Sequence, residues 1–227
     1  MSLPAAVLTD IEGTTTPVAF VHQRLFPYAR ERLAGFIAAH GDEAAVREQL
    51  AATAAEANLD PSDHDGLVRC LQDWIDQDRK ATPLKALQGM IWEAGYREGE
   101  LQGPMYPDVP VALRRWHQLG IRLAVYSSGS EAAQRLIFGY SDAGDLTGLF
   151  QAFFDTRIGH KREADAYRVI SQRMGLPPAN ILFLSDVAEE LAAARAAGLE
   201  VVLVDRDGQT QATGAFRVIE GFHELDF

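Results

Sequence analysis

The chain has 227 residues, 47% of them hydrophobic and 23% charged, which is the usual balance of a soluble globular protein. Its formal net charge of −11 repels phosphate backbones and anionic lipids, so nucleic-acid and membrane partners are not expected. Cys70 is the only cysteine, which excludes an intrachain disulfide and a thiolate zinc cluster. Because no leader segment is recognisable either, we expect a cytoplasmic protein.

The first predicted element is a short buried strand that ends on two acids. Residues 5–9 are apolar up to Thr9, which is typical of a strand buried on both faces of a parallel sheet. Asp10 and Glu12 follow, with Gly13 and Thr14 directly after them. Open α/β sheets bind ligands at strand ends of this kind. One carboxylate can attack and the other can move a proton, as a covalent phosphoryl transfer requires.

The next part of the chain has the periodicity of helices. Apolar residues recur at three- and four-residue steps, as in Leu67, Leu71 and Trp74, and Pro-containing segments separate the periodic stretches. We predict an all-helical domain over residues 18–100. It interrupts a core domain formed by residues 1–17 and 101–227.

Strands and helices alternate in the rest of the chain. This pattern favours an α/β fold with a parallel sheet and right-handed crossovers. The first strand has to return to this sheet, so the core is discontinuous in sequence. The strands are expected at residues 121–126, 152–154, 181–184, 201–204 and 216–219.

Polar residues follow two of these strands and precede one helix. Ser127 and Ser128 come after the strand at 121–126, Asp186 comes after the strand at 181–184, and Lys161 stands just ahead of a helix. Parallel strands bring their carboxyl ends to one edge of the sheet, so these residues should converge on Asp10. Together they offer acids for Mg²⁺, donors for anionic oxygens and one ammonium, which suits phosphoryl transfer.

These motifs resemble those of the haloacid dehalogenase superfamily of aspartate-nucleophile phosphatases. The closer resemblance is to the enolase-phosphatases (acireductone synthases) of methionine salvage. It implies a HAD-like Rossmannoid core, with a central parallel sheet flanked by helices and an inserted all-helical cap domain. The wider superfamily usually has Asp where this chain has Glu12. The resemblance rests on the stretches Asp-Ile-Glu-Gly-Thr-Thr-Thr-Pro, Tyr-Ser-Ser-Gly-Ser, Ile-Gly-His-Lys and Phe-Leu-Ser-Asp-Val.

The resemblance implies a role for each acid. Asp10 would attack phosphorus, form an aspartyl-phosphate and bind Mg²⁺. Glu12 would protonate the leaving oxygen and then activate water, with its backbone carbonyl on the metal. Asp186 would be the second metal carboxylate. Glu190 is open between a supporting acid and a solvated helix face.

The other candidates would bind the substrate. Ser127 and Ser128 would bind phosphoryl oxygens, although they could also cap the helix that begins near residue 131. Lys161 would offset the charge of the nucleophile and the phosphate. Thr14 is expected to orient the nucleophile loop. The isolated His22 and His160 are more typical of structural or exposed positions.

The implied reaction converts 2,3-diketo-5-methylthiopentyl 1-phosphate to the acireductone by enolisation and phosphate hydrolysis. The base for enolisation stays open between Glu12 and a cap residue. The alternatives are another small-metabolite phosphatase or dehalogenase of the superfamily, or a non-enzymatic module that accepts a phosphoryl group. The oligomeric state is not readable from the sequence, and a monomer is the default expectation.

Overall fold

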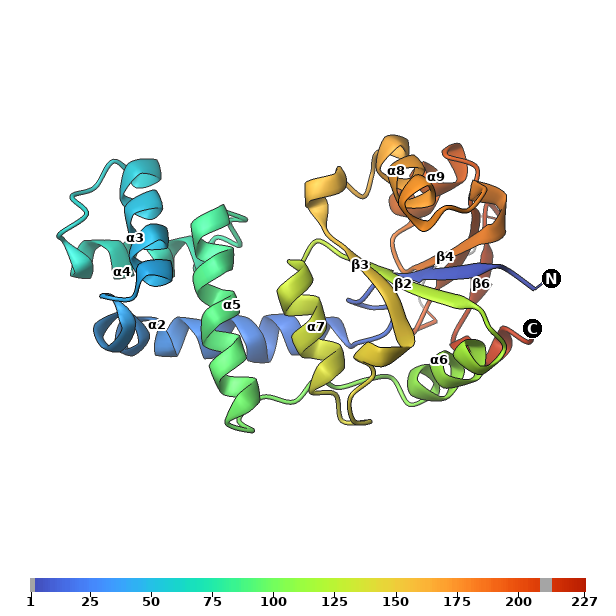
Figure 1. Ribbon diagram of the computed structural model, residues 1–227, viewed down its shortest axis with the longest axis horizontal. Helices are drawn as coiled ribbons and strands as arrows, with labels where there is room; N and C mark the ends of the chain where they lie inside the picture. The colour runs from blue at the N-terminus through green and yellow to red at the C-terminus, as the bar shows by residue number, and fades with distance from the viewer. Residues whose placement is uncertain (1–2, 209–213) are drawn as a thin grey trace. The chain divides into compact units, whose positions relative to one another are not determined.

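The computed structural model describes residues 3–208 and 214–227, and its chain divides into two compact units (Figure 1). The first unit is built from Met1–Val18 and Gln102–Phe227, and the second from Ala19–Leu101. The first unit contains the sheet, and the second is made of helices.

A parallel sheet forms the centre of the first unit, and in its described part the sheet has six strands in the order β3-β2-β1-β4-β5-β6. Every neighbouring pair of these strands is parallel, so all six carboxyl ends point to the same edge. The predicted strands are confirmed, and the short central strand β1 lies between β2 and β4. The bounds are β1 Ala6–Thr9, β2 Arg122–Tyr126, β3 Phe150–Phe154, β4 Ile181–Ser185, β5 Glu200–Val204 and β6 Arg217–Ile219.

Helices cover both faces of this sheet. Leu8, Tyr126 and Phe183 point to one face and pack with Tyr167 of α8 and Leu191 of α9 in a single buried cluster. Alternate strand residues point to the other face, on whose side Figure 1 shows α6. The α/β fold with a central parallel sheet is thus confirmed. The helices are α6 Asp108–Gln118, α7 Glu131–Gly139, α8 Ala164–Met174 and α9 Ala188–Ala196, with short 3₁₀ turns η2 Thr147–Leu149, η3 Thr156–Ile158, η4 Pro178–Asn180 and η5 Phe222–Glu224.

The second unit has its own apolar core. Five leucines from three different helices of this unit are each at most 1% exposed: Leu33, Leu67, Leu71, Leu84 and Leu87. Burial of such side chains is the main force that holds amphipathic helices together. The helical segments are α1 Val18–Phe20, the π-helical turn η1 Val21–Leu25, α2 Phe26–His40, α3 Ala44–Ala57, α4 His64–Asp76 and α5 Thr82–Arg97.

Candidate active site

The chain makes a tight turn where β1 ends. The backbone N–H of Asp10 still donates to the carbonyl of Leu184 on the neighbouring strand, at 2.9 Å. The N–H groups of the three threonines at 14–16 then all donate to the carbonyl of Ile11, at 3.2, 2.9 and 2.9 Å. The turn is therefore closed by its own backbone, and it fixes Asp10 at the carboxyl end of the central strand. Glu12 lies in the same turn, where its backbone pairs with Thr16.

Gly13 brings this turn against the end of β4. Its φ is +72°, a conformation that favours glycine, and a Cβ atom there would lie 2.2 Å from the Oδ2 atom of Asp186. The hydroxyl of Thr14 accepts a hydrogen bond from the backbone N–H of Asp186 at 3.1 Å. Thr14 thus links the turn after β1 to Asp186, while the Thr15 hydroxyl donates to the carbonyls of Asp10 and Ile11 inside the turn.

Lys161 forms the centre of a buried cluster of charges. Its Nζ lies 2.6 Å from Oδ1 of Asp10 and 2.7 Å from Oε2 of Glu190, and each of the three side chains is at most 11% exposed. The hydroxyl of Ser185 donates to the same oxygen of Glu190 at 3.0 Å. Burial alone would lower the pKa of Lys161, but the attraction of Asp10 and Glu190 outweighs it and raises the pKa. Glu190 is therefore a partner of the lysine and not part of a solvated helix face.

Asp186 is the acid that this cluster does not neutralise. Among the described residues, its Oδ1 atom is buried with no hydrogen-bond partner. Burial raises the pKa of Asp186 to about 7, and the nearby charge of Asp10 adds to the rise. Asp10, Asp186 and Glu190 together face one ammonium, so the fully ionised site has an excess of two negative charges. Such an excess attracts a cation.

The two predicted serines follow β2 directly. β2 pairs with β1 so that Val125 lies beside Thr9, which places Ser127 near the carboxyl end of β1. The Ser127 hydroxyl accepts from the N–H of Gly129 at 3.1 Å. Ser130 is the residue that caps α7, so helix capping does not account for Ser127 or Ser128. Ser128, His160, Lys161 and Glu190 line one hollow in common.

Comparisons with known proteins give close sequence matches over most of the chain. Residues 4–198 match the family model of haloacid dehalogenase-like hydrolases. "Enolase-phosphatase E1" of Pseudomonas syringae pv. syringae (strain B728a) is 52% identical over 97% of this chain and 96% of its own length. The enzyme of the same name from Azotobacter vinelandii is 56% identical over 89% of each chain.

This chain belongs to the enolase-phosphatase E1 family.

A solved structure extends the similarity to three dimensions. The crystal structure of UTR4 protein from Saccharomyces cerevisiae superposes with a TM-score of 0.84 at 30% identity, covering 98% of this chain and all of the other. The predicted resemblance to haloacid dehalogenase-like enolase-phosphatases is thus confirmed. As for membranes, no helix in the described ranges is both long and apolar enough to span one.

The site of this family member fits a metal ion. In the described part of the chain, no group of three His, Cys, Asp or Glu side chains is arranged to hold one. Two carboxylates are present, however, and the unpartnered Oδ1 of Asp186 is a buried oxygen without a proton donor. Mg²⁺ needs few protein carboxylates when substrate oxygens complete its shell. Asp10 and Asp186 are the side chains that would hold it.

The sequence analysis missed one residue that contacts the turn after β1. Arg206 donates from Nε and Nη2 to the carbonyl of Thr14, at 3.0 and 2.6 Å, and pairs through Nη1 with both oxygens of Asp108, at 2.8 and 2.9 Å. It follows the end of β5, which points to the same sheet edge as β1. Its position just after a predicted strand is the feature of the sequence by which Arg206 could have been recognised.

The remaining histidine candidate and a second hollow lie elsewhere. His22 is exposed in the helical unit, edge-on to Phe26.

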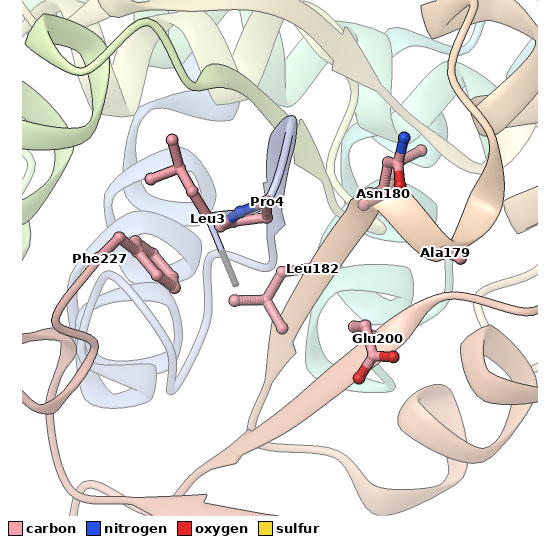
Figure 2. A pocket seen from close by; sticks show the side chains of 8 residues that line it. Leu3, Pro4, Ala179, Asn180, Leu182, Glu200 and Phe227 are labelled. Atoms are coloured by element: carbon pink, nitrogen blue, oxygen red, sulfur yellow. The ribbon is translucent and has the colours of Figure 1, made fainter. Parts of the chain in front are cut away.

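Figure 2 shows a hollow at the start of β4 and β5, which is the amino-terminal edge of the sheet. Among the residues that line it, Glu200 has the one charged side chain. Because it lacks a cluster of polar groups, we place the site at the opposite edge. This hollow is lined by Leu3, Pro4, Ala179, Asn180, Ile181, Leu182, Glu200 and Phe227.

Proposed function

We propose that the protein converts 2,3-diketo-5-methylthiopentyl 1-phosphate to the acireductone in methionine salvage, by enolisation and then hydrolysis of the phosphate ester. The family's name covers both activities, and the relatives match the chain almost from end to end. The observation that carries the proposal is the contact of 2.6 Å between Asp10 and Lys161 at the end of the central strand, beside the unneutralised Asp186.

In the hydrolysis, Asp10 is the proposed nucleophile. Lys161 holds one of its carboxylate oxygens, which leaves the other for attack on phosphorus. As the new bond forms, the ester P–O bond breaks and the leaving oxygen takes a proton from Glu12. Ionised Glu12 then takes a proton from water, whose oxygen attacks phosphorus and displaces Asp10 as inorganic phosphate leaves. Covalent catalysis of this kind splits one difficult displacement into two easier steps.

Ser127, Ser128 and Lys161 are the proposed phosphate contacts. The hydroxyl and amide donors of the serine turn would bind phosphoryl oxygens, and the ammonium would offset their charge. For the enolisation, a base has to remove the proton from the carbon next to the carbonyl. We keep Glu12 and a residue of the helical unit as the two candidates for that base.

Mg²⁺ is the proposed cofactor, held by the carboxylates of Asp10 and Asp186 and by the backbone carbonyl of Glu12. When bound, it would neutralise phosphoryl charge and stabilise the enolate. We propose that the helical unit acts as a cap domain that excludes water and selects the substrate. We further propose that the protein is a monomer. A cytoplasmic location is proposed as well, in keeping with the single cysteine, Cys70.

The test is phosphate release from the diketone phosphate, with and without Mg²⁺. Asp10→Asn should reduce the rate by about a thousandfold or more, because it removes the nucleophile. Asp142→Asn, an acid that bonds a backbone amide away from this cluster, is the matched control and should keep its activity. Turnover by Asp10→Asn close to that of the native enzyme would refute the nucleophile. Faster turnover of unrelated phosphate monoesters would indicate a different phosphatase, and halocarboxylate turnover without metal would indicate a dehalogenase.

A further inference from the structure

Two buried tyrosines hold the segment that carries Lys161. The hydroxyl of Tyr126, the last residue of β2, donates to the carbonyl of Gly159 at 2.9 Å. The hydroxyl of Tyr167, in α8, donates to the carbonyl of Lys161 itself at 2.7 Å. Neither side chain has measurable exposure. The two hydroxyls therefore hold the backbone on both sides of His160.

The two rings also support each other. They meet edge to face, with centroids 5.5 Å apart, and the Nζ of Lys161 lies 5.8 Å from the centroid of Tyr126. Tyr167 packs in turn on Phe183 of β4, at 5.2 Å. Burial raises the pKa of both tyrosines above the ordinary value, so both remain protonated donors. Both hydroxyls are thus positioned by rigid core packing.

The held segment has an unusual backbone conformation. Gly159 has a φ of +139°, and a Cβ atom there would lie 3.0 Å from the Cβ of Ala166. The chain crosses close to α8 at this point and then turns to direct Lys161 inward. A lysine side chain has a flexible four-carbon stem, so the position of its ammonium depends on where the backbone is held.

We propose that Tyr126 and Tyr167 are positioning residues, whose hydroxyls fix the Gly159–Lys161 backbone and thereby place the ammonium of Lys161 between Asp10 and Glu190. This inference rests on the proposed function of Lys161. It assigns the tyrosines no contact with the substrate. Their effect on the reaction passes through the lysine alone.

The test uses Tyr→Phe substitutions, which remove one oxygen and keep the ring. Tyr126→Phe, Tyr167→Phe and the double variant are compared with Tyr28→Phe in the helical unit. Tyr28 is a matched control because it is also buried and also donates its hydroxyl, at 2.8 Å, to Glu100. Unfolding midpoints are measured first, and kcat is measured well below the lowest midpoint. We expect kcat of the double variant to fall about tenfold to a hundredfold, because small displacements of catalytic groups are costly.

A double-mutant comparison separates the positioning of Lys161 from general support of the fold. The double tyrosine variant is combined with Lys161→Gln, and kcat is compared with that of Lys161→Gln alone. If the tyrosines act through Lys161, the loss should be at least about fivefold smaller in this background. A loss of similar size in both backgrounds, or a double variant within about twofold of Tyr28→Phe, would overturn the inference.

The same data distinguish a failure of the inference from a failure of the proposed function. If Lys161→Gln retains native activity, the role proposed for Lys161 is wrong and the inference falls with it. If Lys161→Gln is inactive while the tyrosine variants are fully active, only the inference is overturned.

Discussion

The two sides of the site differ in how their charges are satisfied. On one side, Lys161 contacts Asp10 and Glu190, and Ser185 donates to Glu190, so every charge has a close partner. On the other side, the backbone N–H of Asp186 donates to the hydroxyl of Thr14, but one carboxylate oxygen of Asp186 has no partner among the described residues.

This difference indicates what each side is built to do. A buried charge that is paired and hydrogen-bonded remains ionised and in place, as a fixed electrostatic element should. A buried acid that is left unpaired costs free energy until a cation binds. The lysine side is thus preorganised, and the Asp186 side is where a bound cation would stabilise the protein most.

Breaking the paired side should have the largest effect. Lys161→Met leaves two buried carboxylates without their cation. We therefore expect the free energy of unfolding to fall by about 3 kcal/mol and the activity to fall by about a hundredfold or more. Urea unfolding and phosphate release measure the two effects. Lys80→Met removes an exposed lysine that pairs with Asp78, and it should change neither quantity. Equal effects of the two variants would contradict the comparison.

Asp186→Asn should affect stability in the opposite direction. Because the pKa of Asp186 is about 7 in the folded chain and 3.8 ordinarily, its ionisation costs the folded state stability as pH rises from about 4 to about 7. In EDTA at about pH 8 the variant should therefore melt at a higher temperature than the native protein, while its Mg²⁺ affinity falls at least about a hundredfold. Thermal melts measure the melting temperature, and calorimetric titration measures the Mg²⁺ affinity. A lower melting temperature of the variant in EDTA would contradict the claim that ionised Asp186 destabilises the folded protein.

Protons should compete with Mg²⁺ at the same side. Below about pH 7 Asp186 has to lose a proton before it can bind the ion. The Mg²⁺ affinity of the native protein should therefore approach a decrease of about tenfold for each pH unit below that value. Titration calorimetry in buffers of different ionisation enthalpy measures both the affinity and the protons released. An affinity that does not change between about pH 5.5 and about pH 8 would show that another group holds the ion.

The smallest effect is expected from the hydrogen bond that joins the two strand ends. Thr14→Val keeps the shape but removes the acceptor for the Asp186 N–H, at a cost of about 1 kcal/mol and about threefold in Mg²⁺ affinity. Thr53→Val is the control, since the buried Thr53 in the helical unit donates to the carbonyl of Gln49 at 2.8 Å. The control should lose stability without changing metal affinity; a parallel loss of affinity would rule out the specific link.

Much of this molecule could be predicted from local patterns. Continuous apolar runs identified the strands, three- and four-residue periodicity identified the helices, and their order predicted a parallel sheet. Asp10, Ser127 and Asp186 were recognisable because each directly follows a buried strand, and parallel strands end at the same edge. Such features depend on neighbours within a few residues, which is why the sequence by itself determined them.

Only the tertiary structure decided which side chains meet. The sequence left Glu190 open, and the structure places it on Lys161; it suggested that Thr14 orients its own loop, and the structure bonds it to Asp186. Tyr126 was recognised only as part of the Tyr-Ser-Ser-Gly-Ser stretch, and Arg206 had no distinguishing pattern beyond a strand end. Their partners are distant in the chain, and the choice among many possible partners is made by close packing of the whole core, which no short stretch of sequence contains.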